Sequence, residues 1–282
     1  MSTTAQATHR RLEQYFEPFR RRIIGNDQRF QTPYGAQRIL YADWTASGRL
    51  YRPIEERLLD LLGPYVGNTH TETTVTGSTM TMAYHEAKRI IKRHLGARSK
   101  DVLISSNSGM TGVVNKFQRI LGLKVHEKYH DMVQLPKEKR PVVFVSHMEH
   151  HSNQTSWLET LADVEVIRPD AEGVMDLAHL RELLQQYSCR ETKIAAITSC
   201  SNVTGILTPY HDVAEIMHRH GGLCFVDFAA SAPYINIEMR PENELRRLDA
   251  LYFSPHKFLG GPGSTGILLF DPKLYTNRVP DN

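Results

Sequence analysis

Short apolar runs that alternate with helical patterns strongly limit the folds open to this chain. Seven runs after Ile39 have the length and composition of buried strands: Val102–Ile104, Val142–Val145, Val164–Ile167, Ile194–Ile197, Leu223–Val226, Ala250–Phe253 and Ile267–Phe270. Between several of them apolar residues recur at helical spacing, at Met80–Leu95, Thr111–Leu121, Leu177–Tyr187 and Val213–His220. This alternation predicts an α/β fold: a mostly parallel seven-stranded sheet with helices on both faces.

The first 40 residues follow a different pattern. Their apolar side chains are spaced three or four apart, which predicts an amphipathic helix interrupted near Pro18; they are Leu12, Tyr15, Phe16, Phe19 and Ile23. We expect residues 1–40 to form an N-terminal helical arm and residues 41–282 to form one large domain. The charged stretch 124–140 is expected to be an exposed excursion between a helix and a strand.

Composition favours small-molecule chemistry. Lysine and arginine number 34 against 31 acidic residues, so the net charge of +3 gives no nucleic-acid footprint. The three cysteines, Cys189, Cys200 and Cys224, lack CxxC spacing and indicate neither a disulfide framework nor a cysteine zinc site. With no secretory signal and no membrane-length apolar run, the sequence predicts a reducing, cytoplasmic setting and no membrane partner.

The segment Ser254-Pro255-His256-Lys257 comes just after a predicted strand and before a glycine-rich turn. A lysine amine can bond covalently to an aldehyde cofactor, while Ser254 and His256 can donate hydrogen bonds to its phosphate. A lone lysine of this kind is more often a solvated surface charge. Asp227 strengthens the hypothesis, because pyridoxal phosphate needs both a lysine for its aldehyde and an anion for its ring nitrogen.

Three other polar segments also follow predicted strands, where ligands of α/β sheets bind. Gly109, Met110 and Thr111 open a helix whose N-terminus could hold a phosphate, although serine and asparagine before it also suit an ordinary helix cap. His150 could stack on a flat ring or transfer protons, or be an exposed loop histidine. Asn202 could donate to a ring oxygen, or be a turn residue.

Two further motifs suggest other functions. Gly261-Pro262-Gly263-Ser264-Thr265-Gly266 has the spacing of a dinucleotide fingerprint, but a strand is predicted after it rather than a helix, which argues against that function. His147, His150 and His151 with Glu149 could bind a metal for hydrolysis, but their spacing is not that of a helical zinc site. The sequence therefore nominates no metal ligand.

Six ordered segments together resemble the class V aminotransferase family of fold-type I pyridoxal phosphate enzymes, and within it the cysteine desulfurase and selenocysteine lyase group. The resemblance covers roughly Tyr41 to Phe270. The segments are Tyr41–Ser47, Gly109–Thr111, Glu149–Asn153, Ser201–Gly205, Val226-Asp227, and Ser254–Lys257 followed by the glycine-rich turn.

The resemblance implies a role for each nominated residue. Lys257 would form the resting aldimine with the cofactor and act as the catalytic base, and His150 would stack on the ring as the second catalytic residue. Asp227 would pair with the ring nitrogen, and Asn202 would contact the ring oxygen. The phosphate would be held by the turn Gly109, Met110 and Thr111 with Ser254 and His256. His70 is similar to a residue near the active site of the family's dimer, and a homodimer is expected.

Three departures from the family pattern stand out. Ala230 occupies the position where most members carry Gln or His, so one hydrogen bond to the cofactor oxygen is expected to be missing. Trp44 replaces a small polar residue, which would reshape the substrate pocket. The family's C-terminal small domain is not expected in this chain, and with it go the Arg that binds the substrate carboxylate and the Cys that takes the sulfur.

The function expected from this resemblance is pyridoxal-phosphate-dependent C–S cleavage of cysteine, with transfer to a possible sulfur-acceptor protein. The alternatives are a class V aminotransferase or epimerase with another amino-acid substrate, and an incomplete, non-catalytic cofactor-binding domain.

Overall fold

The computed structural model describes residues 3–279, with side chains from residue 11 onward. These residues divide into two compact units. The first runs up to Tyr84 and includes His256–Gly263, and the second contains His85–Pro255 and the segment from Ser264 onward. Among the described helices, none is long and apolar enough to cross a membrane.

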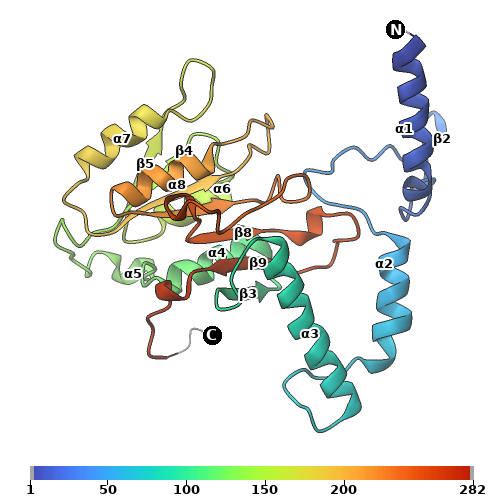
Figure 1. The fold of residues 1–282 in the computed structure, drawn as a ribbon, viewed down its shortest axis with the longest axis horizontal. Helices are drawn as coiled ribbons and strands as arrows, with labels where there is room; N and C mark the ends of the chain where they lie inside the picture. The colour runs from blue at the N-terminus through green and yellow to red at the C-terminus, as the bar shows by residue number, and fades with distance from the viewer. Residues whose placement is uncertain (1–2, 280–282) are drawn as a thin grey trace. The chain divides into compact units, whose positions relative to one another are not determined.

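A seven-stranded sheet forms the second unit (Figure 1). Its strands, in spatial order, are β3 (Val102–Ser106), β9 (Gly266–Phe270), β8 (Ala250–Phe253), β7 (Leu223–Asp227), β6 (Lys193–Thr198), β4 (Val142–Ser146) and β5 (Asp163–Ile167). The pairs from β8 through β5 are parallel, whereas β9 runs antiparallel to both β8 and β3. The predicted mostly parallel sheet of seven strands is therefore confirmed.

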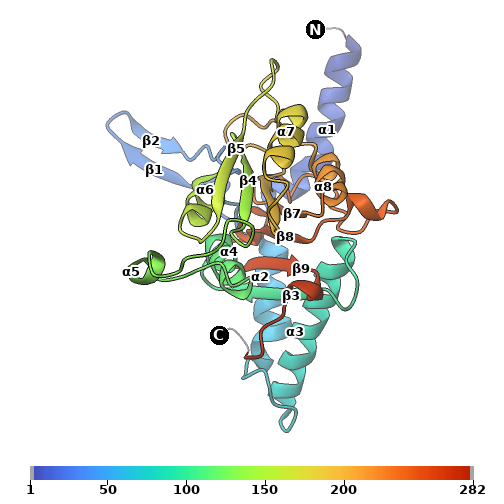
Figure 2. The same ribbon diagram turned by 90° about the vertical axis from the view of Figure 1, so that its left-hand side faces the viewer.

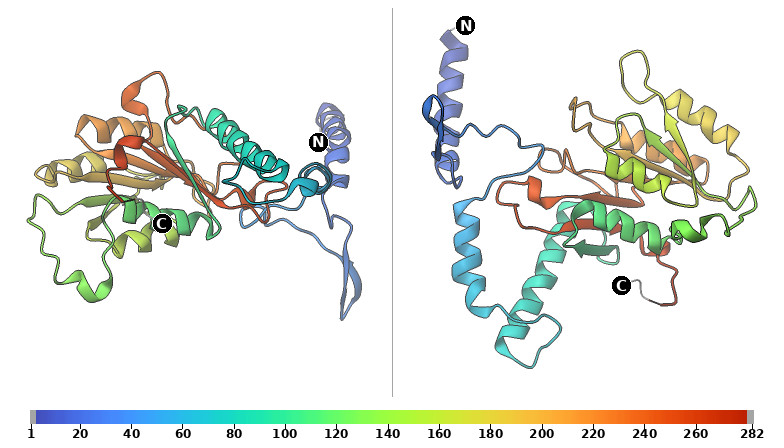
Figure 3. Two further views of the ribbon diagram at one scale, coloured as in Figure 1. Left: turned by 90° about the horizontal axis from the view of Figure 1, so that it is seen from below. Right: turned by 180° about the vertical axis from the view of Figure 1, so that it is seen from behind.

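Helices cover both faces of this sheet. Helices α7 (Leu177–Gln186) and α8 (Tyr210–Arg219) lie on one face, and α4 (Gly109–Ile120) and α6 (His151–Leu158) lie on the other (Figures 2 and 3). Right-handed crossovers explain the change of face, because α6 leads from β4 out to β5 whereas α7 returns to β6 on the other side of β4. The strands β4 and β6 are parallel, but the connections that leave them lead toward opposite sides of the sheet. Ligands of such sheets bind at this switch point.

A buried apolar cluster lies between α4, α6 and the sheet. Phe117 of α4 contacts Phe225 and Phe270 with ring centroids 5.0 Å apart in each case. Trp157 of α6 stacks on Phe225 at 6.3 Å. All four side chains are fully buried, so this apolar layer fixes the two helices on the strands whose ends carry the predicted site.

The four predicted helices correspond to α3 (Val75–His94), α4, α7 and α8. The 124–140 excursion contains one short helix, α5 (Glu127–His130). Sequence analysis did not predict α6, nor the hairpin of β1 (Arg29–Thr32) and β2 (Gly35–Arg38) in the first unit.

The first unit also holds α1 (Thr3–Arg21), α2 (Arg52–Arg57), a π-helical turn at Leu58–Leu62 and a 3-10 turn at Gly63–Tyr65. Helix α1 continues through Pro18, so the interruption predicted there is wrong. Pro18 has no backbone N–H to donate to the carbonyl of Gln14, yet the helix extends beyond it to Arg21.

Candidate functional site

The carboxyl ends of six strands meet along one edge of the second unit, which we call the carboxyl edge. Strands β4, β5, β6, β7 and β8 are parallel and end there at Ser146, Ile167, Thr198, Asp227 and Phe253. Strand β3 ends there as well, because β9 runs antiparallel between it and β8. Polar segments that follow these strands therefore share one edge.

Gly109, Met110 and Thr111 form the first turn of α4, directly after β3. Gly109 has φ of 68°, a left-handed conformation that favours glycine. Ser108, the N-cap residue, makes no side-chain capping hydrogen bond. The turn also passes very close to β9, since a Cβ on Gly266 would lie 2.1 Å from the carbonyl carbon of Gly109. The N-terminus of α4 thus packs directly against β9, and this close approach requires glycine at Gly266.

Asp227 ends β7 and is almost fully buried, at 2% exposure. Its Oδ1 accepts a hydrogen bond of 2.7 Å from the backbone N–H of Ala229. Its carbonyl oxygen accepts from the backbone N–H of Ser199 at 2.8 Å and from the Ser199 hydroxyl at 2.9 Å, which links the ends of β6 and β7. The carboxylate is therefore held at a defined place in a desolvated environment.

His150 and Asn202 follow β4 and β6. His150 is the N-cap of α6, and its Nδ1 lies 3.3 Å from the backbone nitrogen of Ser152, from which it accepts a hydrogen bond. Asn202 sits in a turn built by Ser201, whose buried hydroxyl oxygen accepts from the backbone N–H groups of Val203 and Thr204, each at 3.2 Å. Both side chains are exposed on ordered turns.

Ser254 follows β8 at the same edge and is buried. The structure thus brings the first turn of α4, His150, Asn202, Asp227 and Ser254 to one edge of the second unit. His256 and Lys257 come next in the chain, in the 3-10 turn Pro255–Lys257, and belong to the first unit.

Within the first unit, the lysine segment packs against the segment that begins with Tyr41. The backbone N–H of Gly48 donates to the carbonyl of His256 at 2.8 Å, and that of Gly260 donates to the carbonyl of Arg49 at 2.7 Å. A Cβ on Gly48 would lie 1.9 Å from the carbonyl oxygen of Phe258, so only glycine fits this approach. Backbone hydrogen bonds therefore join the segment that begins with Tyr41 to the lysine segment, and both carried the family resemblance.

The electrostatics of this segment favour a neutral imidazole. Burial and the nearby Lys257 lower the pKa of His256, while a backbone hydrogen bond with Ala46 acts in the opposite direction. In the same unit, His70 has φ of 85°, an uncommon left-handed backbone for a residue that is not glycine. Trp44 contacts Tyr41 edge-on at 5.9 Å.

Sequence analysis missed a set of buried polar groups beneath the carboxyl edge. Glu149 and Asn153 belong to the segment that carried the resemblance, but only His150 was given a role. Asn153 is fully buried, and its Oδ1 accepts hydrogen bonds from the Tyr252 hydroxyl at 2.6 Å and from Trp157 Nε1 at 3.3 Å. A signal was present in the sequence, because Asn153 falls in the first turn of the helix that starts two residues after Glu149, close enough to reach its carboxylate.

The protonation of Glu149 is shifted toward neutral pH. Burial of its carboxyl group raises its pKa to about 7, against the effect of hydrogen bonds from Ser146, Asn153 and Thr198. The negative charge of Asp227 raises it further. The carboxyl edge therefore contains two carboxyl groups close enough to influence one another.

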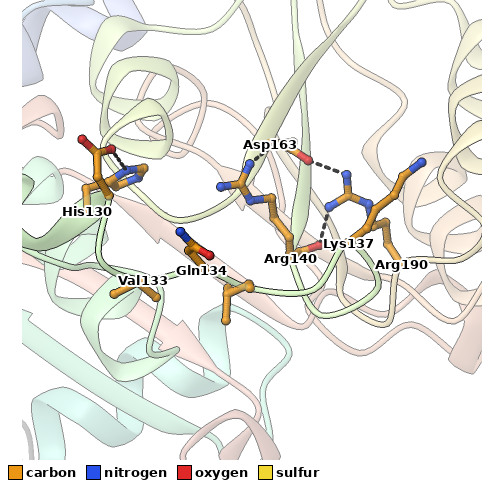
Figure 4. Close-up of a pocket in the computed structure, with 9 residues that line it drawn as sticks. His130, Val133, Gln134, Lys137, Arg140, Asp163 and Arg190 are labelled. Carbon is orange, nitrogen blue, oxygen red and sulfur yellow. Dashed lines mark hydrogen bonds and ion pairs between the residues drawn. The ribbon is translucent and has the colours of Figure 1, made fainter.

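Other site hypotheses find less support. Among the described side chains, which run from residue 11 to residue 279, no group of three or more His, Cys, Asp or Glu residues is arranged to hold a metal ion. A cavity of about 520 Å³ lies near the opposite, amino ends of β4, β5 and β6 (Figure 4). Its Arg190 and Arg140 both pair with Asp163, at 2.5 and 3.4 Å.

The sequence of this chain is similar to those of curated proteins over most of its length. It is 30% identical over 234 residues to a probable cysteine desulfurase of Halalkalibacterium halodurans, covering 82% of this chain and 52% of that protein. It is 25% identical over 233 residues to a cysteine desulfurase of Haloferax volcanii, covering 80% of this chain and 49% of that protein. The chain spans about half the length of the curated relatives it matches.

Solved structures share the fold. The apo structure of a cysteine desulfurase from Thermococcus onnurineus superposes with a TM-score of 0.69 at 21% identity, covering 91% of this chain and 57% of that one. A NifS-like protein from Rickettsia africae gives a TM-score of 0.67 at 20% identity, covering 86% and 61%. The predicted fold-type I architecture is confirmed by these structures and by the strand order.

A family model also matches this chain. The model of class-V aminotransferases matches residues 40–280, which is most of the chain and includes every element of the seven-stranded sheet. The resemblance drawn from short segments of sequence is thereby confirmed over the whole sheet. This chain belongs to the class-V aminotransferase family.

Proposed function

We propose that the protein binds pyridoxal 5'-phosphate at the carboxyl edge and uses it to cleave the C–S bond of cysteine. The observation that carries the proposal is the convergence of residues from β3, β4, β6, β7 and β8 at one edge. Each was nominated from sequence for a different part of one cofactor, and separate strands deliver them to the same side of the sheet.

The residues at the carboxyl edge are suited to bind the phosphate group of the cofactor. The first turn of α4 offers backbone N–H groups and the Thr111 hydroxyl, and its N-cap side chain does not occupy them. Around Gly109 there is space for a ligand, since a Cβ built there would meet nothing within 4 Å. Ser254 and His256 are the other proposed phosphate ligands, both supplied by the segment that follows β8.

Other residues at the carboxyl edge are suited to bind the pyridine ring of the cofactor. A buried carboxylate such as that of Asp227 is stabilised by a cation, and a protonated ring nitrogen is one. His150 would cover the ring face, and Asn202 would donate to the ring oxygen. Ala230 would make no hydrogen bond there, because its side chain has no polar atom.

Bound pyridoxal phosphate supplies an electron sink for the negative charge that develops at the Cα of an amino acid. Lys257 is the group that would hold the aldehyde and, once displaced by the substrate amine, would move the Cα proton. Asp227 would keep the proton on the ring nitrogen. His150 would act as a second proton-transfer group beside the ring.

Cysteine is the proposed substrate because relatives of this family with that printed activity cover about four fifths of the chain. The reaction converts cysteine into alanine while the sulfur passes as a neutral atom to an acceptor thiol, forming a persulfide. We propose a sulfur-acceptor protein as the source of that thiol, a homodimer as the assembly, and a reducing cytoplasmic setting, which the three free cysteines favour.

Product analysis tests the proposal. The purified chain is loaded with pyridoxal phosphate and incubated with cysteine and dithiothreitol, which releases sulfide from a persulfide. We expect alanine and sulfide in equal amounts, and none with Lys257→Ala. Glutamate formed from 2-oxoglutarate and another amino acid would instead indicate an aminotransferase. A chain that binds the cofactor but forms no product would be the non-catalytic domain, and desulfuration would be wrong.

A further inference from the structure

Strands β4 and β6 separate before they reach the carboxyl edge. Their parallel pairing runs from Val142 opposite Lys193 to Phe144 opposite Ala195, whereas β4 continues to Ser146 and β6 to Thr198. By contrast, β6 pairs with β7 as far as Thr198 opposite Asp227. The gap between β4 and β6 thus opens at the switch point of the sheet, where the connections lead toward opposite sides.

Side chains of Glu149 and Asn153 replace the missing ladder bonds in this gap. Glu149 Oε1 accepts from the backbone N–H of Thr198 at 2.8 Å, from that of Ser146 at 3.2 Å, and from the Ser146 hydroxyl at 2.5 Å. Asn153 Nδ2 donates to the Ala196 carbonyl at 3.2 Å. Backbone groups that a closed ladder would pair are therefore satisfied while the strands remain apart.

The two side chains also hold each other. Asn153 Nδ2 donates to Glu149 Oε2 at 2.7 Å, so one carboxylate joins the ends of β4 and β6 to the first turn of α6. Glu149 as a residue is half-buried, while its carboxyl group is turned inward and buried. A carboxylate in such a place is retained only when donors surround it, as they do here.

Two residues of the proposed cofactor site depend on this link. His150 directly follows Glu149 and caps α6, so the placement of the Glu149 carboxylate fixes the start of that helix and the histidine on it. Thr198, which donates to Glu149, is paired in register with Asp227. Glu149 therefore lies between the ring-stacking and ring-nitrogen groups of the proposed function.

We propose that Glu149 is a positioning residue that keeps β4 and β6 apart at the carboxyl edge and so sets the spacing between His150 and Asp227. The inference rests on the proposed function, because that spacing matters for a flat ring held between the two residues. Glu149 itself is not proposed to touch the cofactor.

The donor and acceptor pattern makes glutamine a sharp probe. Glu149→Gln preserves the shape but replaces one acceptor oxygen with a donor NH2. If the NH2 faces Asn153, it meets another NH2; if it faces Ser146 and Thr198, it meets two backbone N–H groups. Asn153 cannot turn over to help, because its Oδ1 already accepts from Tyr252 and Trp157.

The first measurement needs no cofactor. Amide hydrogen exchange is compared for wild type, Glu149→Gln and the control Glu159→Gln, which makes the same chemical change at a side chain 67% exposed just after α6. We expect exchange at the Ser146 and Thr198 amides to be at least about 10-fold faster in Glu149→Gln only. We also expect the ring NMR signals of His150 to shift in that variant only.

The second measurement uses added pyridoxal phosphate. We expect Glu149→Gln to bind it about 10-fold or more weakly, as is typical when a supporting hydrogen-bonded group behind a ligand is lost. The pH at which the bound cofactor changes its absorption should fall, because a negative charge near Asp227 is removed. A general loss of stability would not move that midpoint.

The outcomes separate this inference from the proposed function. Faster exchange together with weaker binding and a lower midpoint supports it. Faster exchange with unchanged binding, midpoint and His150 signals would reduce Glu149 to a structural role and overturn the inference. Unchanged exchange would also overturn it. If wild type does not bind the cofactor, the proposed function fails, and the exchange rates and His150 signals still decide whether Glu149 positions this edge.

Discussion

The hydroxyl of Tyr252 donates a hydrogen bond of 2.6 Å to the side-chain oxygen of Asn153, which joins β8 to α6 in the interior of the second unit. Both side chains are fully buried. Since Asn153 also contacts Glu149, the bond connects the strand that precedes Ser254 with the gap between β4 and β6. The side-chain amide of Asn153 thus connects β8 with the ends of β4 and β6, which lie far from β8 in the sequence.

Asn153→Ala should destabilise the protein far more than Tyr252→Phe. The alanine variant leaves buried donors on Tyr252 and Trp157 without an acceptor, which we expect to cost about 3 kcal/mol in the free energy of unfolding. Tyr252→Phe removes only one hydroxyl, so we expect about 1 kcal/mol. Urea unfolding measures both, and equal losses would show that the network is not centred on Asn153.

Glu149 should make stability depend on pH near neutrality. Its pKa is raised to about 7 in the folded protein from an ordinary 4.5, so the folded state binds the proton more tightly. Stability from this group is therefore present below pH 4.5 and is lost as pH rises through 7. The unfolding free energy of wild type minus that of Glu149→Gln should fall by roughly 2–3 kcal/mol between pH 5 and pH 8.

Urea unfolding at several pH values checks this expectation. Taking the difference between two variants cancels other titrating groups, such as His256, that both proteins share. Glu159→Gln again serves as the control: it removes an ion pair with Lys124, so its difference from wild type should stay constant from pH 5 to pH 8. A difference that stays constant from pH 5 to pH 8 would show that the Glu149 carboxyl is not the titrating group.

A buried ion network should support the β3–β9 side of the sheet. Asp101 accepts from Arg98 at 2.7 Å and from Arg240 at 2.9 Å, and Asp271 pairs with the same two arginines. Burial alone would raise the pKa of Asp101, but these hydrogen bonds outweigh it and lower that pKa. Asp101→Ala should cost about 3–5 kcal/mol of unfolding free energy, because it leaves buried charge uncompensated.

The sign of the pH effect follows from the lowered pKa. Stability from Asp101 is present above its unfolded pKa and is lost as pH falls through its folded pKa, so wild type and Asp101→Ala should converge in strong acid. Glu191→Gln is the matched surface control, since its pair with Lys139 is largely exposed and should leave stability unchanged. Equal effects of the two substitutions in chemical denaturation would refute the network.

Gly266→Ala should disturb the phosphate turn. The new Cβ would lie 2.1 Å from the carbonyl carbon of Gly109, so α4 or β9 must shift, at a cost of roughly 1–3 kcal/mol. Pyridoxal phosphate binding should weaken along with stability. Ser264→Ala, at an exposed position just before β9, should change neither. Normal cofactor affinity in Gly266→Ala would argue against this turn as the phosphate site.

Much of the sheet could be predicted because each strand is marked locally. Apolar runs such as Leu223–Val226 sit between turns, and their burial on both faces leaves a continuous hydrophobic signal. The polar residues of the carboxyl edge could be nominated for the same reason: once a strand end is known, Asp227 or Asn202 follows from the sequence. The family resemblance then ordered these segments, and the family match confirmed it.

Other features depend on contacts that no local pattern encodes. Helix α6 was missed because its residues His151–Leu158 are polar along much of their length, and it is stabilised by Asn153 and Trp157 reaching into the interior. The role of Glu149 depends on where β4 and β6 separate, which is a property of the sheet. The interruption predicted at Pro18 was wrong, because helix α1 continues to Arg21.

The site of covalent attachment tests the central claim most directly. Wild type, Lys257→Ala and the control Lys273→Ala are mixed with pyridoxal phosphate, reduced with borohydride, and analysed by absorbance and by mass spectrometry of their peptides. We predict that wild type and Lys273→Ala absorb near the violet edge of the visible before reduction and carry the cofactor on Lys257 afterward, while Lys257→Ala does neither. A colourless wild-type protein, or attachment at another lysine, would contradict the account.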